Sequence, residues 1–314
     1  MENPTESVSF EFLPEPVIEL ILTMVPEEDI LACNLVCRTW KRLISRKSYW
    51  KKRYQEKKIN WYEIPEHIRD KAGGWMILYA QYRYQILSKN YIHNPSGHRR
   101  FGGWVISATH RNMWLVEQVP DGCEPLPSSD FFGRKEGCCF VTSFDWSSKC
   151  YTVDLWREGL KLKPGVMKLI LPFQIKCSQM YAARFDCGGQ FNWELRLLDS
   201  HWKVIRFYKQ PTIDVPPSEE WKTAEYGFKF ESKNDFQFRD LRYIEFIHEG
   251  KDTQFWAGHF GTKFARSCVT IELLEPDVAV AVEETKEQGD EKKKKIPRRR
   301  MGGLAKWLRK RKGR

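Results

Sequence analysis

Long hydrophobic runs and targeting signals are absent from this sequence of 314 residues. No stretch approaches the ~20 consecutive uncharged apolar residues that a membrane-spanning helix requires. The chain begins Met-Glu-Asn-Pro-Thr-Glu, which is acidic and polar, so it lacks the basic and apolar segments of a secretory signal peptide. We therefore expect a cytoplasmic protein, and an association with the ER surface or a partly nuclear location stays open.

Metal-binding and catalytic motifs are also absent. The nine cysteines include no Cys-x-x-Cys pair, and the seven histidines show no metal-ligand spacing. The odd cysteine count in a long chain argues against a disulfide framework, so we expect mostly buried, reduced thiols. The sequence contains neither a phosphate-binding glycine loop nor the nucleophile elbow of a hydrolase. We expect no metal, no cofactor and no catalytic residue in the chain.

Acidic residues are missing from segment 292–314, which carries 13 of the 52 Lys and Arg residues. The other 39 basic and 41 acidic residues give residues 1–291 a net charge of −2, although the whole chain carries +11. A nucleic-acid-binding fold would more often carry its basic excess on the folded domain. Any role in nucleic-acid binding is therefore confined to the tail.

The basic tail is open to three interpretations. Segments 292–295 and 298–300 have the composition of a nuclear import signal. Leu304, Trp307 and Leu308 recur at helical spacing among basic residues, which is typical of a short helix on an anionic membrane. Each basic residue near such a surface contributes roughly 1 kcal/mol. The third interpretation is a solvated tail without a partner, and a protein targeted by this tail is an alternative class of function.

Hydrophobic residues make up 41% of the sequence and aromatic residues 14%, which excludes a wholly disordered chain. At roughly 150 residues per domain, the length predicts about two domains. We predict an α+β multidomain protein with a helical start, a helical linker, an antiparallel β-sandwich and a disordered basic tail. The expected parts are a disordered 1–9, a helical domain over 10–58, a linker over 59–92, a sandwich over 93–276 and a charged tail over 277–314.

Helical periodicity dominates the start of the chain. Val17, Leu20, Ile21 and Met24 lie at i, i+3, i+4 and i+7, which places them on one apolar helix face. Four short helices over residues 10–58 bury little surface on their own. We therefore expect this module to need a partner.

Period-two alternation replaces this pattern after about residue 100. Val269, Ile271 and Leu273, for example, alternate with polar residues. Turn formers such as Pro216-Pro217 separate the strand-like runs. Many short alternating strands without long helices between them predict an antiparallel sandwich.

A recognisable motif runs through the helical segment. Its residues are, in order, Phe12-Leu13-Pro14-Glu15, Ile18, Ile21-Leu22, 26–31, Leu35-Val36-Cys37-Arg38-Thr39-Trp40 and Trp50. The motif resembles an F-box, and F-box proteins are substrate receptors of SCF (Skp–cullin–F-box) ubiquitin ligases. The resemblance implies a Skp-type adaptor and a cullin scaffold as partners. It also implies that the adaptor docks on the apolar face around Leu13, Pro14, Ile18, Ile21 and Leu31, in agreement with a small module that exposes apolar side chains.

A second motif runs through the β-rich body. Its residues are Phe140-Val141-Thr142-Ser143-Phe144, Val153-Asp154-Leu155, 181–188 and 248–258. It is similar to the F-box-associated domain of the sugar-recognising F-box proteins, which is an antiparallel β-sandwich. Better-known members bind the inner chitobiose and mannose core of N-linked glycans and mark misfolded glycoproteins for ubiquitination. The resemblance implies a lectin-like receptor that binds glycoproteins in ER-associated degradation.

The resemblance also implies a glycan site on four residues. Phe144 and Trp256 would stack on sugar rings, Asp186 would accept hydrogen bonds from sugar hydroxyls, and Phe255 stands where the family usually has Tyr. Sugars have apolar faces and a rim of hydroxyls, so such a site combines aromatic and polar groups. From the sequence alone, Phe144 could instead fill the core and Asp186 could serve only as a turn former. Phe255 and His259 depart from the family pattern, so an SCF receptor for a non-glycan protein degron is the alternative.

Overall fold

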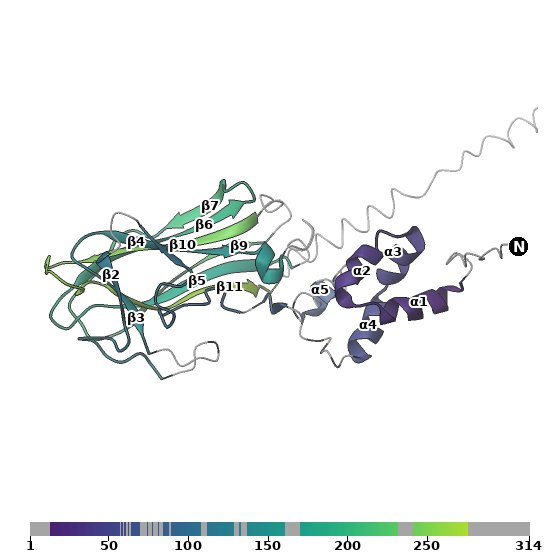
Figure 1. Ribbon diagram of the computed structural model, residues 1–314, viewed down its shortest axis with the longest axis horizontal. Coiled ribbons are helices and arrows are strands. Elements are labelled where there is room, and N and C mark those ends of the chain that lie inside the picture. Colours follow the sequence, from purple (N-terminus) through teal and green to yellow (C-terminus); the bar gives the residue numbers. More distant parts are fainter. Residues whose placement is uncertain are drawn as a thin grey trace, which may run out of the picture. The chain divides into compact units, whose positions relative to one another are not determined.

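The computed structural model describes residues 13–56, 58, 60, 62, 64–69, 74, 77, 81, 84–87, 89–107, 112–128, 132, 137–160, 170–231 and 241–275 (Figure 1). The predicted disordered N-terminus, much of the predicted linker over 59–92 and the charged tail over 277–314 lie outside these residues.

Short helices occupy the N-terminal part of the described chain, as predicted. They are α1 (Glu15–Met24), α2 (Glu27–Cys33), α3 (Arg38–Ile44), α4 (Lys47–Glu56) and α5 (Glu66–Arg69). Pro16 lies in the first turn of α1, where its missing N–H removes no helical hydrogen bond. α3 begins after Cys37, whose sulfur accepts a hydrogen bond from the backbone N–H of Trp40.

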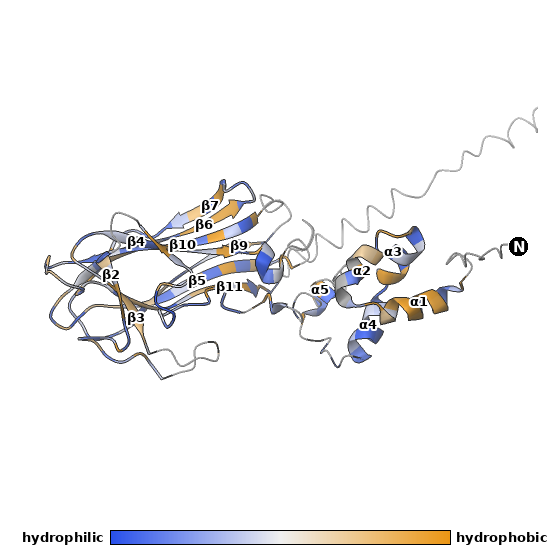
Figure 2. Cartoon of the chain, in the orientation of Figure 1, coloured by the Kyte–Doolittle hydropathy of each residue, from blue (hydrophilic) through white to orange (hydrophobic). Residues whose placement is uncertain are grey.

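Polar side chains of α4 donate hydrogen bonds to the C-terminal end of α1. The Tyr49 hydroxyl donates to the Leu22 carbonyl at 2.7 Å, and the Arg53 guanidinium donates to the Leu22 and Thr23 carbonyls at 3.0 and 3.2 Å. The last carbonyls of a helix have no partner within the helix, so these donors supply what α1 lacks. α1 buries Ile18 and Leu22 against its neighbours and is mainly hydrophobic (Figure 2).

The β-rich body consists of two antiparallel sheets, which confirms the predicted sandwich. Its strands are β1 (Trp104–Ile106), β2 (Trp114–Glu117), β3 (Cys139–Thr142), β4 (Ser147–Asp154), β5 (Phe173–Ala182), β6 (Gly189–Asp199), β7 (Val204–Lys209), β8 (Ile213–Val215), β9 (Lys222–Phe230), β10 (Leu241–Asp252) and β11 (Lys263–Leu273). One sheet has the order β1-β4-β10-β6-β7, with β8 also paired to β6. The other sheet has the order β2-β3-β11-β5-β9, and a short helical turn, η4 (Trp156–Leu160), follows β4.

A buried lysine and a buried histidine lie together among the aromatic side chains of this body. The Lys149 side-chain nitrogen lies 3.4 Å from the centre of the Trp104 ring and 4.2 Å from that of Phe140. It also lies 2.8 Å from Nδ1 of His248 on β10. Burial lowers the pKa of both Lys149 and His248 well below their ordinary values.

A second buried lysine, Lys263, has a different partner. Its ammonium nitrogen donates to Glu117 Oε2 at 2.5 Å, so the charge of this lysine is matched by a carboxylate. The two lysines therefore provide a natural comparison between a buried amine next to a neutral ring and one in an ion pair.

Candidate functional site

Strand register brings three loops to one end of the sandwich. Gly250 on β10 pairs with Ser147 on β4, and Asp252 pairs with Gly189 on β6. In the other sheet, Lys263 pairs with both Val141 on β3 and Ala182 on β5. The loops 143–146, 183–188 and 253–262 therefore lie next to one another, although they are far apart in the sequence. Loops at the end of a rigid sheet commonly carry binding residues.

Two of the four predicted glycan-site residues pack directly together. The rings of Phe144 and Phe255 have their centres 5.1 Å apart at an interplanar angle of 72°, an edge-to-face contact. Phe144 is half-buried, and Phe255 is 74% exposed. Phe144 thus supports the exposed ring of Phe255, which lies in the neighbouring loop 253–262.

Trp256 lies beside this pair in the sequence but packs on a different ring. Its ring centre is 5.9 Å from that of Phe260, also edge to face, and its side chain is 41% exposed. Phe260 in turn lies 5.1 Å from the guanidinium of Arg184, close enough for a cation–π contact. Loop 253–262 therefore presents two exposed aromatic rings, each backed by a second ring.

Asp186 is not a free acceptor, because its carboxylate is held by Arg184. The guanidinium donates from Nε to Oδ1 at 2.9 Å and from Nη2 to Oδ2 at 3.4 Å. Arg184 also hydrogen-bonds to Asp121, and its hydrogen bond to Asp186 lowers the pKa of that carboxyl. The Asp186 side chain remains about a third exposed, at 34%, and each carboxylate oxygen keeps a second lone pair for an outside donor.

Two residues outside the predicted site also shape this end of the sandwich. Arg184 joins Asp121 and Asp186 across two loops, and Asp252 accepts backbone hydrogen bonds from Phe255 and Trp256. An aspartate at the last position of a strand and before a turn is a signal for such backbone contacts. The partners of Arg184 could not be found from local sequence because Asp121 lies in another loop.

The helical module exposes a second group of apolar side chains. Val17, Leu20 and Met24 on α1 are exposed, as are Leu35 and Val36 after α2. An apolar surface of this kind marks a site for a partner.

The predicted adaptor-binding residues divide between core and surface. Ile18 is buried in the core, Leu13 and Ile21 are half-buried, and Pro14 is exposed. The side chain of Leu31 lies outside the described residues. Because Ile18 faces inward together with Leu22, the outward apolar face of α1 is formed by Leu20 and its neighbours.

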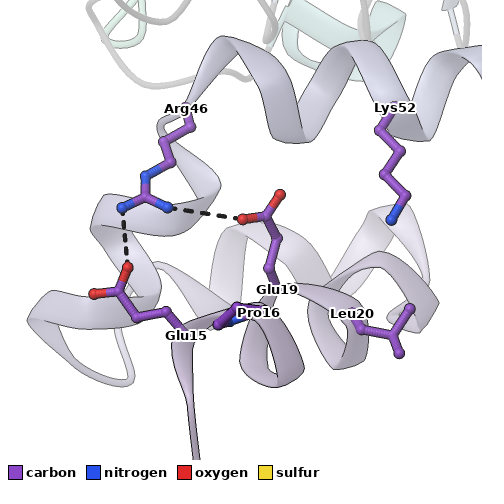
Figure 3. A pocket seen from close by; sticks show the side chains of 6 residues that line it. All are labelled: Glu15, Pro16, Glu19, Leu20, Arg46 and Lys52. Carbon is purple, nitrogen blue, oxygen red and sulfur yellow. Dashed lines mark hydrogen bonds and ion pairs between the residues drawn. The ribbon is translucent and has the colours of Figure 1, made fainter.

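Charged residues form a cavity of about 310 Å³ next to this apolar face (Figure 3). Arg46 pairs with Glu15 at 3.0 Å and with Glu19 at 3.7 Å, while Lys52 and Leu20 line the other side. The Arg46 hydrogen bond lowers the pKa of the Glu15 carboxyl. These pairs connect α1 to the segment that joins α3 to α4.

Among the described residues, no group of three His, Cys, Asp or Glu side chains is arranged to hold a metal ion. Within the same residues, no helix has the length and apolar character needed to cross a membrane.

Comparison with known proteins identifies both parts of the chain. Residues 10–56 match the F-box-like family model, and residues 82–271 match the model of the F-box associated region. Human F-box only protein 44 is 30% identical over 263 residues, which cover 82% of this chain and 95% of the relative. Human F-box only protein 6 is 28% identical over 264 residues, or 84% of each chain. Mouse F-box only protein 27 is 28% identical over 297 residues, which cover 87% of this chain and 94% of the relative.

Proposed function

The chain belongs to the F-box only proteins that carry an F-box associated region, and we propose that it is the substrate-recognition subunit of an SCF ubiquitin ligase. In this role the apolar face of α1, centred on Leu20, binds the Skp-type adaptor, which connects the chain to the cullin scaffold. The chain carries no catalytic step, because other subunits of such a ligase transfer ubiquitin. The loops at the end of the sandwich bind the substrate.

We further propose that the substrate is the N-linked glycan of misfolded glycoproteins. The observation that carries this proposal is the pair of exposed rings, Phe255 and Trp256, presented side by side on one loop. Such rings can stack on the apolar faces of sugars. The remaining acceptor capacity of Asp186 can bind sugar hydroxyls, and hydrogen bonds to an ionised carboxylate are stronger than neutral ones.

A glycan array probed with the full chain tests this proposal. Trp256→Ala should abolish the signal, because it removes one of the exposed rings. Trp202→Ala is the matched control, because Trp202 is similarly exposed, at 53%, but lies in the turn after β6, at the other end of that strand. Equal signals from native protein and Trp256→Ala, or no signal from the native protein, would refute glycan binding at these loops.

A non-glycan degron is the second candidate function. Two observations favour it: Arg184 already occupies the carboxylate of Asp186, and Phe255 has no hydroxyl with which to bind a sugar. Exposed aromatic rings also serve as anchors in protein–protein contacts. Capture of substrates that continues after enzymatic removal of their N-glycans would favour the degron over the glycan.

A further inference from the structure

A buried aspartate holds the loop that presents the exposed rings. Asp252 is the last residue of β10 and is only 1% exposed. Its Oδ1 accepts the backbone N–H of Phe255 at 2.6 Å, and its Oδ2 accepts that of Trp256 at 3.1 Å. Both oxygens of one carboxylate are therefore used on the backbone of the two residues that form the aromatic surface. Hydrogen bonds to an ionised acceptor are among the stronger ones in proteins.

Asp252 holds the backbone at Phe255 in a conformation that this type of residue rarely adopts. Phe255 has φ of +58°, in the left-handed region that bulky L-residues rarely adopt. Such a conformation persists only where surrounding contacts determine it. In the described part of the chain, the backbone N–H groups of Phe255 and Trp256 both donate to the Asp252 carboxylate. The backbone conformation from which the Phe255 ring projects thus depends on this carboxylate.

Asp252 also ties its loop to the two neighbouring loops. Its backbone N–H donates to the Ser143 carbonyl at 2.8 Å, directly before Phe144. The next residue, Thr253, donates its N–H to the Gly188 carbonyl at 3.1 Å, in the loop that contains Asp186. The chain at Asp252 and Thr253 therefore connects the loop of the exposed rings to the loops that contain Phe144 and Asp186.

We propose that Asp252 is a positioning residue of the substrate site: it contacts no substrate, and it fixes Phe255 and Trp256 in the arrangement that binds one. This inference rests on the proposed function for its consequence in binding. Its structural part, the control of ring orientation, stands without any ligand. Holding a binding surface in its bound arrangement raises affinity because less conformational freedom is lost on binding.

The first test needs no ligand. The full chain is labelled with 5-fluorotryptophan, and the Trp256 resonance is assigned by its absence from Trp256→Phe. Asp252→Ala should shift or broaden this resonance, whereas Asp252→Asn, which keeps one acceptor oxygen, should change it less. The matched control is Asp199→Ala. Asp199 accepts backbone hydrogen bonds from His201 and Lys203 around Trp202, which also has positive φ, but at the other end of β6.

The second test measures affinity for an N-glycan bearing the chitobiose core. Asp252→Ala should weaken binding about tenfold or more in the native background, through loss of pre-organisation. In the Trp256→Ala background it should add little, since the surface that it positions is already lost. A general loss of stability would instead lower the Tm of Asp252→Ala and Asp199→Ala alike and leave the Trp256 resonance of the folded protein in place.

The outcomes separate the two proposals. If the native chain binds no glycan but Asp252→Ala still moves the Trp256 resonance, the proposed glycan function fails and the positioning role stands. If the Trp256 resonance of Asp252→Ala matches that of native protein, the positioning role is overturned. It is also overturned if the native chain binds glycan and Asp252→Ala binds it as tightly as Asp199→Ala does. A shifted resonance together with an affinity loss that disappears in the Trp256→Ala background supports it.

Discussion

Removing His248 should destabilise the sandwich, whereas removing His248 and Lys149 together should not. Both side chains are fully buried, and the 2.8 Å contact between them is the hydrogen bond that Lys149 makes in the described part of the chain. His248→Phe leaves the amine without an acceptor in the core. A buried polar group that loses its partner costs about 1–3 kcal/mol of unfolding free energy.

The double variant Lys149→Met/His248→Phe removes both polar groups and fills similar space with apolar atoms. Met is unbranched and adapts to irregular cavities, so it can follow the path of the lysine chain. Replacing a buried polar pair with apolar residues is often neutral or stabilising by about 1–4 kcal/mol. The double variant should therefore be at least as stable as the native protein. A gain of about 2 kcal/mol over His248→Phe corresponds to roughly 4–8 °C in Tm for a domain of this size.

Urea and thermal unfolding of the full chain, followed by tryptophan fluorescence, measure the stability of native protein, His248→Phe and the double variant. Lys263→Met is the contrasting control, because it leaves the Glu117 carboxylate buried without its ion-pair partner. It should cost about 3–5 kcal/mol. The reasoning is refuted if Lys149→Met/His248→Phe is less stable than His248→Phe. That result would mean that the contact of the Lys149 side-chain nitrogen with the Trp104 and Phe140 rings stabilises the native state.

Three further predictions concern pH, adaptor binding and the tail. Burial lowers the pKa of His248 below its ordinary 6.5, so the unfolded chain binds a proton that the folded chain does not, and stability falls as the pH drops through that value. Between about pH 7.5 and 5.5 this loss is about 1.4 kcal/mol of unfolding free energy, and it should be absent from His248→Phe. If urea unfolding at several pH values shows the same pH dependence of the unfolding free energy in both proteins, the prediction is contradicted. Leu20→Asp should weaken capture of the purified Skp-type adaptor by about tenfold to a hundredfold, because burial of a leucine contributes about 1.5–3 kcal/mol. The control Val105→Asp on β1 should leave adaptor capture unchanged. Deletion of residues 292–314 should abolish sedimentation with vesicles rich in anionic lipid and leave glycan binding intact, and undiminished sedimentation would exclude a membrane role for the tail.

Local patterns in the sequence were sufficient for the architecture. The spacing of Val17, Leu20, Ile21 and Met24 predicted a helix, and α1 spans Glu15–Met24. Alternation over residues 269–273 predicted a strand, and β11 contains it. These predictions succeed because the repeat of an α-helix or a β-strand is a property of neighbouring residues, so the apolar pattern alone identifies the element.

The sequence also contains the motifs that identify the family, but it does not show which of their side chains are buried or what these side chains contact. It placed Ile18 among the adaptor-binding residues, whereas the helix turns it into the core and leaves Leu20 outside. The sequence is compatible with a core position for Phe144, whereas the fold places its ring against Phe255. The same alternation that predicts strands places Lys149 at an inward position of β4, but no local feature indicates that a histidine on β10 receives it.

Tertiary structure alone decided which groups meet at the substrate end. Phe144 and Phe255 come from different loops, as do Asp121 and its partner Arg184, and their contacts follow from the pairing of β10 with β4 and β6 and of β11 with β3 and β5. Strand register is fixed by the packing of a whole sheet face, so it cannot be obtained from any one segment. For the same reason, the carboxylate of Asp186 looks free in the sequence and is bound by Arg184 in the fold.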